Sequence, residues 1–345
     1  MFGFGFIKQG IASTQFFLWG KKHFTQTGYR QNIKSYTGPV QPQAVVALND
    51  QLNDGADLEG KTLIVTGSNQ GLGKEIALYA ASKQANVYML CRNKARAEAA
   101  RDDIRQQTKN ENVDILLADV SEPRQIKRVV ADFRAREGKL DCLVCNAGAL
   151  FNERRTNSDG DEITLMAHLV GGSYLLTKLL MPELEKADDP RVIYVASGGM
   201  YNTKFPSWEE AASSGKFESK YNGNMAYAYA KRGQVLLAER LASQYPGIKF
   251  VSCHPGWTKT EGVDAAYGSQ ASILEPMRTL WEGSEGICWL ATSPSTDLEG
   301  GAFYLDRKPQ RKHIAGPFFT DGTYTRNTDT EVDDMMKKLL EKVGV

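Results

Sequence analysis

The sequence has almost no net charge and few cysteines. Its 42 Lys and Arg residues balance 41 Asp and Glu residues, and the resulting charge of +1 is too small for a general attraction to nucleic acid. Five cysteines among 345 residues are an odd number and far too few for a disulfide-stapled secreted scaffold. We therefore expect no nucleic-acid partner and an intracellular, reducing compartment.

Disorder and fibrous repeats are also excluded, because 41% of the residues are hydrophobic and 32 glycines stand against 12 prolines. Cys142 and Cys145 form a C-x-x-C motif, but they lie in an apolar run. Residues three apart on a strand point to opposite faces, so we interpret the pair as two small core residues. No metal site is predicted, and the sequence carries no signal for an oligomeric state.

Acidic residues are absent from residues 1–49, which hold five Lys or Arg and nine aromatic residues. No stretch of this arm reaches the roughly 18 apolar residues of a membrane-spanning helix. A basic, aromatic composition is typical of an interfacial anchor or of a targeting segment that is retained. The hypothesis is a contact with a membrane, at the mitochondrial or endoplasmic reticulum surface, or with a membrane-bound complex. The alternative is an arm packed on the surface of the protein's own domain.

Short apolar runs alternate with longer segments of helical periodicity from residue 61 onward. The runs expected to be strands are 62–66, 86–91, 113–118, 140–145, 192–196, 249–253 and 302–305. This alternation predicts an α/β fold, a single Rossmann-like, doubly wound parallel sheet with helices on both faces. We expect this domain to span residues 55–310, after the 1–49 arm. An extension, 311–345, follows it, with an amphipathic helix that a capping box at Thr328 and Glu331 opens.

A glycine-rich turn follows the first predicted strand and precedes a helix. Glycines at this spacing allow a tight turn, a close backbone approach to a pyrophosphate and exposure of the helix N-terminus to its charge. A glycine-rich turn without a ligand is the alternative. The residues expected to bind the dinucleotide here are Gly67, Ser68, Asn69, Gly71, Leu72 and Gly73.

The end of the second predicted strand bears on the choice of cofactor. An NAD enzyme places a carboxylate there for the ribose 2′-hydroxyl, whereas this sequence has Cys91 followed by Arg92. A planar guanidinium matches a 2′-phosphate, so NADP(H) is favoured over NAD(H). Arg92 as an ordinary charge at a helix start is the alternative. Asp119 and Val120, at the end of the third strand, are expected to meet the adenine.

Tyr227 and Lys231 are spaced i, i+4 in a segment of helical composition, so both side chains leave the same face. A fixed ammonium favours the ionised form of a neighbouring phenol and suits it to acid–base catalysis. Ser197 ends the fifth strand upstream. Pro255, Gly256 and Thr258 follow the sixth strand downstream.

This ordered series of motifs resembles the short-chain dehydrogenase/reductase superfamily over residues 58–308. It includes Asn146, Ala147 and Gly148 after the fourth strand. The resemblance implies that these three residues bind the dinucleotide together with Pro255, Gly256, Thr258, Tyr227 and Lys231. The segments 89–93, 197–200, 254–257 and 306–309 resemble the retinol-dehydrogenase-like branch. The resemblance implies a sheet of about seven strands and NAD(P)-dependent interconversion of an alcohol and a carbonyl. It also implies that Tyr227 is the general acid/base, that Lys231 lowers its pKa and holds the nicotinamide ribose, and that Ser197 hydrogen-bonds the substrate oxygen.

The sequence departs from the family pattern at the Asn that holds a relay water. Alignment from Asp159 and Gly160 upstream places His168 at this position, whereas alignment from residues 175–177 downstream places Leu169 there, because Gly171 and Gly172 resemble a one-residue insertion. A His could hold the water and a Leu could not.

Two further differences concern the strand-end motif and the substrate loop. Cys145 stands where the family has a first Asn. The 29 residues between Ser197 and Tyr227 are about twice the number in the most compact members. Phe205, Trp208 and Tyr221 in this segment are expected to form part of the substrate wall, together with residues 257–283.

Two functions follow from these motifs. The first is an NADP-dependent oxidoreductase that interconverts a lipophilic alcohol and carbonyl, with Ser197, Tyr227, Lys231 and His168 as its catalytic residues. The second is a nucleotide-binding accessory or structural subunit of a larger membrane-associated complex, with weak or no catalysis.

Overall fold

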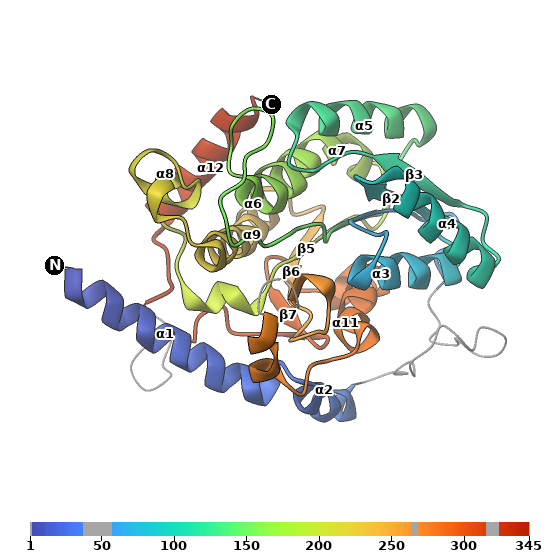
Figure 1. Ribbon diagram of the computed structural model, residues 1–345. Helices are drawn as coiled ribbons and strands as arrows, with labels where there is room; N and C mark the ends of the chain where they lie inside the picture. The colour runs from blue at the N-terminus through green and yellow to red at the C-terminus, as the bar shows by residue number, and fades with distance from the viewer. Residues whose placement is uncertain (1, 37–56, 264–267, 315–323, 345) are drawn as a thin grey trace.

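The computed structural model describes residues 2–36, 57–263, 268–314 and 324–344 (Figure 1). The strands are β1 (Thr62–Thr66), β2 (Asn86–Cys91), β3 (Val113–Leu117), β4 (Cys142–Cys145), β5 (Arg191–Val195), β6 (Lys249–Cys253), β7 (Phe303–Leu305) and β8 (Lys308–Pro309). The helices are α1 (Phe2–His23), α2 (Gln26–Asn32), α3 (Gly71–Ser82), α4 (Lys94–Thr108), α5 (Pro123–Arg136), α6 (Ile163–Leu165), α7 (Leu176–Leu184), α8 (Trp208–Ala211), α9 (Gly223–Gln244), α11 (Leu280–Thr292) and α12 (Asp329–Val343). The 3₁₀-helices are η1 (Ile33–Ser35), η3 (Gly198–Asn202), η4 (Gly215–Lys220), η5 (Gly268–Leu274) and η6 (Ser295–Asp297). A π-helix, η2 (Met166–Leu175), lies between α6 and α7.

One sheet contains all these strands in the order β3-β2-β1-β4-β5-β6-β7-β8. Pairing is parallel as far as β7, and β8 returns antiparallel to β7. The predicted parallel, Rossmann-like fold is confirmed, with eight strands where about seven were expected. The extra strand is a two-residue hairpin arm, which is too short to give a hydrophobic pattern. The strand order reverses between β1 and β4, and this is where such sheets bind ligands.

Helices cover both faces of the sheet. The side chains of α3, α4 and α11 pack on one face, and those of α5, η2, α7 and α9 pack on the other. Cys142 packs against the layer of α3, α4 and α11, and Cys145 packs against the layer of α5, η2, α7 and α9. Both are buried free thiols, as expected for core residues. Among the described residues, no cluster of His, Cys, Asp or Glu could hold a metal ion.

The segment Ile163–Leu184 is long and apolar enough to cross a membrane by composition, with a mean hydropathy of 1.3. However, 78% of its most apolar stretch is buried inside the fold, where η2 and α7 pack against α5, α9 and β4. Its apolar composition is therefore accounted for by burial in the core.

The C-terminal helix α12 begins with the predicted capping box, in which Thr328 and Glu331 each accept a backbone N–H of the other. Its stripe of Val332, Met335, Leu339 and Val343 is buried in the main core, whereas Leu340 on the same helix is 49% exposed. The stripe therefore completes the core against η2 and α9.

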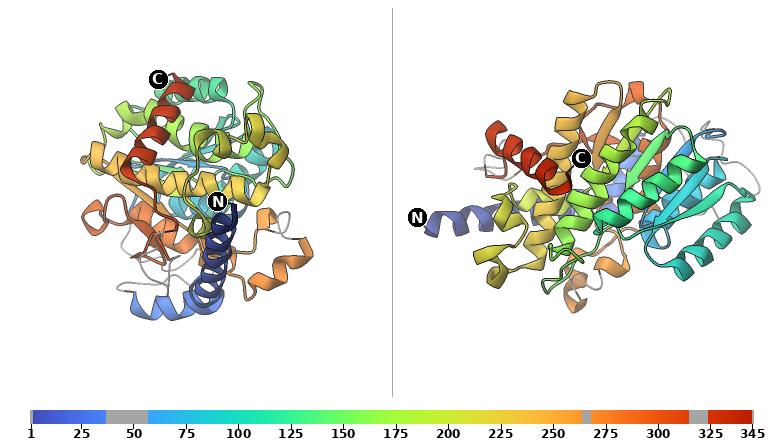
Figure 2. Two further views of the ribbon diagram at one scale, coloured as in Figure 1. Left: turned by 90° about the vertical axis from the view of Figure 1, so that its left-hand side faces the viewer. Right: turned by 90° about the horizontal axis from the view of Figure 1, so that it is seen from above.

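The N-terminal arm forms α1, α2 and η1. Its Phe24 and Tyr29 are 1% and 4% exposed, and Phe24 belongs to a third apolar cluster with Trp257 and Phe303. The amino-terminal end of α1 projects beyond the domain (Figures 1 and 2). Residues 10–36 thus include buried contacts with the domain. The boundary expected between residues 49 and 55 lies outside the described residues.

Candidate active site

Three glycines shape the turn between β1 and α3. Gly67 and Gly71 have φ angles of +67° and +56°, which disfavour residues with side chains. Gly73 allows close packing, because a Cβ there would lie 2.3 Å from the Gly67 carbonyl oxygen. The turn is tied to the end of β4 by Thr66, whose Oγ1 accepts the N–H groups of Asn146 and Ala147 at 2.9 and 2.8 Å. The two ligand-binding loops at the switch point are therefore fixed to each other.

A cleft of about 730 Å³ opens over this turn. Eleven of the residues predicted to bind the dinucleotide line it: Gly67, Asn69, Gly71, Leu72, Gly73, Arg92, Asp119, Val120, Asn146, Ala147 and Gly148. Ser68 is not among the residues that line the cleft. Its buried hydroxyl instead donates to the Val65 carbonyl at 2.9 Å and contacts the Cys91 thiol at 3.6 Å. The shape of the glycine turn and the volume above it fit a dinucleotide. When bound, such a cofactor would supply or accept a hydride.

Two guanidinium groups stand at the edge of this cleft. The side chain of Arg92 is 64% exposed, and its Nη1 lies 3.6 Å from Asp119 Oδ2. Arg96 donates to Gln70 Oε1 at 3.2 Å from the first turn of α4. Cys91, in the place of a carboxylate, is buried, and burial raises the pKa of its thiol. The edge is therefore cationic where an NAD enzyme has an acid.

A second cavity, of about 280 Å³, adjoins the cleft, and the two share Leu72, Asn146, Gly148, Ala149, Thr260 and Gly262 in their walls. The four predicted catalytic residues, His168, Ser197, Tyr227 and Lys231, all line it. So do Pro255, Gly256 and Thr258 from the loop after β6. The predicted site residues therefore come together although they are spread over the whole sheet.

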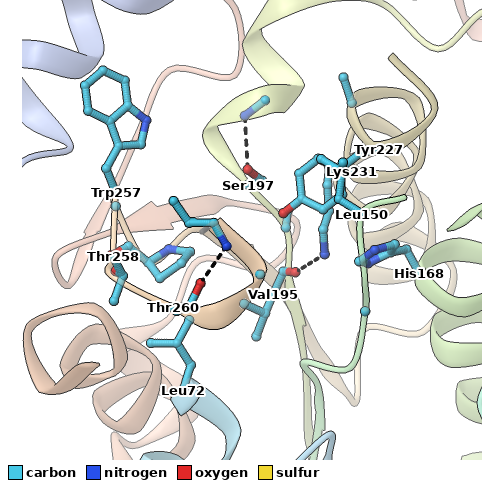
Figure 3. Close-up of a pocket in the computed structure, with 18 of the residues that line it drawn as sticks. Leu72, Leu150, His168, Val195, Ser197, Tyr227, Lys231, Trp257, Thr258 and Thr260 are labelled. Carbon is cyan, nitrogen blue, oxygen red and sulfur yellow. Dashed lines mark hydrogen bonds between the residues drawn. The ribbon is translucent and has the colours of Figure 1, made fainter. Parts of the chain in front are cut away.

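Tyr227 and Lys231 project from α9 toward Ser197 and the end of β5 (Figure 3). The Lys231 Nζ lies 5.4 Å from the centre of the Tyr227 ring. Ser197 follows β5 as the cap of η3, and its Oγ accepts the Gly199 N–H at 3.2 Å. A hydroxyl, a phenol and an ammonium thus share one cavity wall, as general acid–base chemistry requires.

Lys231 is held from two sides. Its Nζ donates to the Val195 carbonyl at 2.7 Å and to Gln234 Oε1 at 3.1 Å. The Gln234 Nε2 in turn donates to the His168 carbonyl and to Ser173 Oγ. Burial lowers the pKa of Lys231 from 10.5 to about 7. Gln234 was missed from the sequence because, as an ordinary helix residue three positions after Lys231, it carries no motif.

The structure places His168, and not Leu169, in the cavity that Ser197, Tyr227 and Lys231 line. The His168 and Tyr227 rings lie 5.2 Å apart at 86°. Leu169 is fully buried in the core. The segment is the π-helix η2, whose wider turn takes in the extra residue that Gly171 and Gly172 suggested. Alignment from upstream is therefore the one that matches the geometry.

The His168 ring is in an apolar setting. Burial, with the charge of Lys231, lowers its pKa well below 6.5, so the ring is neutral at physiological pH. Its Nε2 lies 3.2 Å from the Ala149 nitrogen and 3.0 Å from the Ala149 oxygen. Among the residues that the structure describes, none hydrogen-bonds the buried Nδ1. This nitrogen is therefore a buried polar atom with unused hydrogen-bonding capacity, next to the Tyr227 ring.

The expected substrate wall is only partly correct. Trp257, Val263 and Leu274 line the cavity, as predicted for residues 257–283. The three aromatic residues upstream lie elsewhere. Phe205 is buried in the core and Trp208 packs against that core, while Tyr221 donates from its hydroxyl to the Phe151 carbonyl. The long segment stabilises the helical layer, a role that aromatic content alone does not distinguish from substrate contact.

One lining residue comes from the N-terminal arm. Phe16 of α1 lies in the cavity wall, more than 180 positions before Ser197 in the sequence. The only sequence signal was the aromatic richness of the arm, which also suits a membrane contact. Motif order therefore could not place this residue.

Residues 61–208 match the family model described as short chain dehydrogenase. Dehydrogenase/reductase SDR family member 12 of Homo sapiens is 36% identical over 88% of this chain and 90% of its own length. Retinol dehydrogenase 12 of Homo sapiens is 34% identical over 73% of this chain and 79% of its own. These names support an enzyme and give no support to the accessory-subunit alternative.

Solved structures share the fold at low identity. An uncharacterized protein from Mycobacterium Paratuberculosis superposes with a TM-score of 0.64 at 20% identity, covering 84% of this chain and 96% of its own. A short chain dehydrogenase from Escherichia coli CFT073, solved in complex with NADPH, gives 0.57 at 19% identity and covers 73% and 98%. With the relatives above, they lead to one conclusion: the chain belongs to the short-chain dehydrogenase/reductase family, in its retinol-dehydrogenase-like branch, and is an oxidoreductase.

Proposed function

We propose that the protein is an NADP(H)-dependent oxidoreductase that interconverts a lipophilic alcohol and the corresponding carbonyl compound. The observation that carries the proposal is the junction of the two cavities. The glycine-lined cleft for a dinucleotide opens beside a smaller cavity that holds Ser197, Tyr227 and Lys231. A hydride donor in the cleft and a proton donor in the cavity can therefore act on the same carbonyl group.

The proton chemistry is assigned to the chain's own groups. In the reduction direction, the Tyr227 hydroxyl gives its proton to the carbonyl oxygen, and Ser197 donates a hydrogen bond to that oxygen. The ammonium of Lys231 stabilises the phenolate that remains. His168, whose Nδ1 has no hydrogen-bond partner among the described residues, holds the water through which Tyr227 regains its proton. In oxidation each proton moves the opposite way.

The proposed preference for NADP(H) rests on Arg92 and Arg96 at the cleft edge and on the neutral Cys91. We expect NADPH to bind at least several-fold more tightly than NADH in a fluorescence titration. The double variant Cys91→Asp, Arg92→Ala should reverse this order, because it places a carboxylate where the 2′-phosphate would lie. Equal affinities in the unaltered protein would remove the basis of the preference.

The proposed substrate class follows from the cavity wall. Leu150, Val195, Trp257, Val263 and Leu274 present apolar groups around the polar catalytic end. Such a site accepts a molecule with one oxygen function and a large apolar body. Retinol dehydrogenases 12 and 13, two of the relatives, are named for an alcohol with a large apolar body. The corresponding aldehyde, all-trans-retinal, is therefore a suitable first probe.

Turnover tests the proposal directly. The protein should consume NADPH with a panel of apolar aldehydes and ketones that includes all-trans-retinal, and Tyr227→Phe should abolish this while NADPH binding stays nearly intact. Tyr229→Phe is the matched control, because Tyr229 is on the same helix and its hydroxyl donates to Glu210 Oε1 at 2.9 Å. Near-normal kcat in Tyr227→Phe would show that the chemistry is elsewhere.

A membrane contact of the arm is the second part of the proposal. It is supported by the acid-free composition of residues 1–49 and by the projection of the start of α1 beyond the domain. Residues 1–9 contain three Phe and Lys8. We expect the full chain to float with anionic phosphatidylserine vesicles at low salt, less so as salt rises, and a chain lacking residues 1–9 to stay behind. A full chain that does not float at low salt would contradict the contact.

A further inference from the structure

The N-terminal arm reaches the active site through Phe16. This side chain lines the catalytic cavity, and its ring centre lies 6.0 Å from those of Trp257 and Phe24. It also packs on the turn that carries the predicted catalytic serine, because a Cβ on Gly198 would lie 3.0 Å from the Phe16 ring. Phe16 therefore occupies space at the substrate end of the cavity.

The end of α1 is attached to the loop after β6 by main-chain hydrogen bonds. The Trp257 N–H donates to the Phe24 carbonyl at 2.7 Å. Gly20 lets the helix lie against the indole, because a Cβ there would be 2.4 Å from the Trp257 ring. The Gln26 N–H donates to the Pro276 carbonyl at 2.9 Å. The arm and this loop are thus packed as one unit.

A buried ion pair fixes the same attachment. Arg278 and Asp306 have side chains 1% and 3% exposed, and Nη2 lies 2.8 Å from Oδ2. The guanidinium also donates to the carbonyls of His23 and Phe24, at 3.0 and 2.9 Å. Asn32 of the arm donates to Asp306 Oδ2 at 2.8 Å. The arm therefore supplies two of the acceptors of this buried guanidinium.

From these contacts we propose that α1 of the N-terminal arm is a wall of the substrate cavity and that Phe16 sets the size of the apolar group that fits there. The inference rests on the proposed function, because it deepens the substrate side of the same site. The arm is then part of the enzyme's specificity as well as its means of reaching a membrane. Phe16 acts on substrate choice and takes no part in proton or hydride transfer.

The test is equilibrium binding of two alcohols of different bulk, all-trans-retinol and hexan-1-ol, by calorimetry. The protein is NADP⁺-bound and carries Tyr227→Phe in every variant, so that the alcohols bind without being oxidised. Phe16→Ala should weaken hexan-1-ol binding about tenfold and leave retinol binding equal or stronger, and Phe16→Trp should weaken retinol about tenfold. Leu18→Ala is the matched control, because Leu18 is on the same helix and 56% exposed. An unchanged ratio of the two dissociation constants in both Phe16 variants would overturn the proposal.

A second measurement does not need a ligand. Asp306→Asn removes the counter-charge of Arg278 and keeps a residue type that tolerates the φ of +52° at this position. Hydrogen exchange at the Trp257 amide should be slow in the unaltered protein and at least tenfold faster in this variant. Fast exchange in the unaltered protein would show that the arm is not docked. If the protein binds the alcohols but does not turn over carbonyls with NADPH, the proposed function is contradicted. The role of α1 and Phe16 as a wall of the cavity would then still stand.

Discussion

Removing the buried Lys231 ammonium should change how the stability of the protein depends on pH. Burial lowers the pKa of Lys231 from 10.5 to about 7 in the folded protein. Between these values the unfolded chain binds a proton that the folded chain does not, so the free energy of unfolding rises with pH across this window. Below pH 7 both states are increasingly protonated and this contribution is flat.

The slope approaches about 1.4 kcal/mol per pH unit well above pH 7. For one group that is half-protonated near pH 7, the gain from pH 7 to pH 9 is about 2 kcal/mol. The hydrogen bonds to Val195 and Gln234 shift the whole curve of the unaltered protein relative to Lys231→Met, but they do not cancel its slope. The difference between the two proteins therefore isolates the titration.

The assay is urea unfolding of the cofactor-free protein at pH 6, 7, 8 and 9. The free energy of unfolding of the unaltered protein, minus that of Lys231→Met, should change little between pH 6 and pH 7 and rise by about 2 kcal/mol between pH 7 and pH 9. Lys220→Met, which removes an exposed lysine, controls for the loss of one positive charge. Parallel curves for the unaltered protein and Lys231→Met would refute the reasoning, because they would place the ammonium in contact with solvent.

Three further predictions concern His168 and the glycine turn. His168→Asn should keep kcat within about tenfold, whereas His168→Leu should lower it about a hundredfold in steady-state assays, because only Asn can hold a relay water; equal values would remove His168 from the relay. Below pH 6.5 the unfolded chain gains a proton at His168 that the folded chain does not, so the free energy of unfolding decreases as the pH is lowered. In urea titrations at pH 5 to 7, His168→Asn should make this decrease smaller. An unchanged decrease would contradict the burial of His168. Gly73→Ala should destroy NADPH binding in a fluorescence titration, since its Cβ would collide with the Gly67 carbonyl, whereas Gly138→Ala, with open space around it, should not; normal binding in Gly73→Ala would disprove the tight packing of this turn.

The sequence predicts the fold, and it predicts that the motif residues meet in one place, for a physical reason. Strands of a parallel sheet end at one edge, so motifs that follow Thr66, Cys145 and Val195 must lie close together. The i, i+4 spacing of Tyr227 and Lys231 then places both on one face of α9. Local periodicity and strand order are sufficient for these residues.

Residues whose position depends on contacts distant in sequence could not be placed in this way. The choice between His168 and Leu169 needs the π-helix, and hydrophobic patterning does not distinguish a π turn from an α turn. Phe16 lies in the cavity wall on a helix whose end is held by Arg278, more than 250 residues later, which donates to the carbonyls of His23 and Phe24. Neither contact has a local signal.

The most direct test of the oxidoreductase assignment follows the transferred hydride and its dependence on the Tyr227 hydroxyl. NADPH deuterated at the transferable position of the nicotinamide ring is incubated with all-trans-retinal and the apolar carbonyl panel, and the products are weighed by mass spectrometry. We expect an alcohol one mass unit heavier with the unaltered protein and with Tyr229→Phe. We expect none with Tyr227→Phe, although this variant binds NADPH. Labelled alcohol from Tyr227→Phe at the normal rate, or no labelled alcohol from any carbonyl with the unaltered protein, would contradict the assignment.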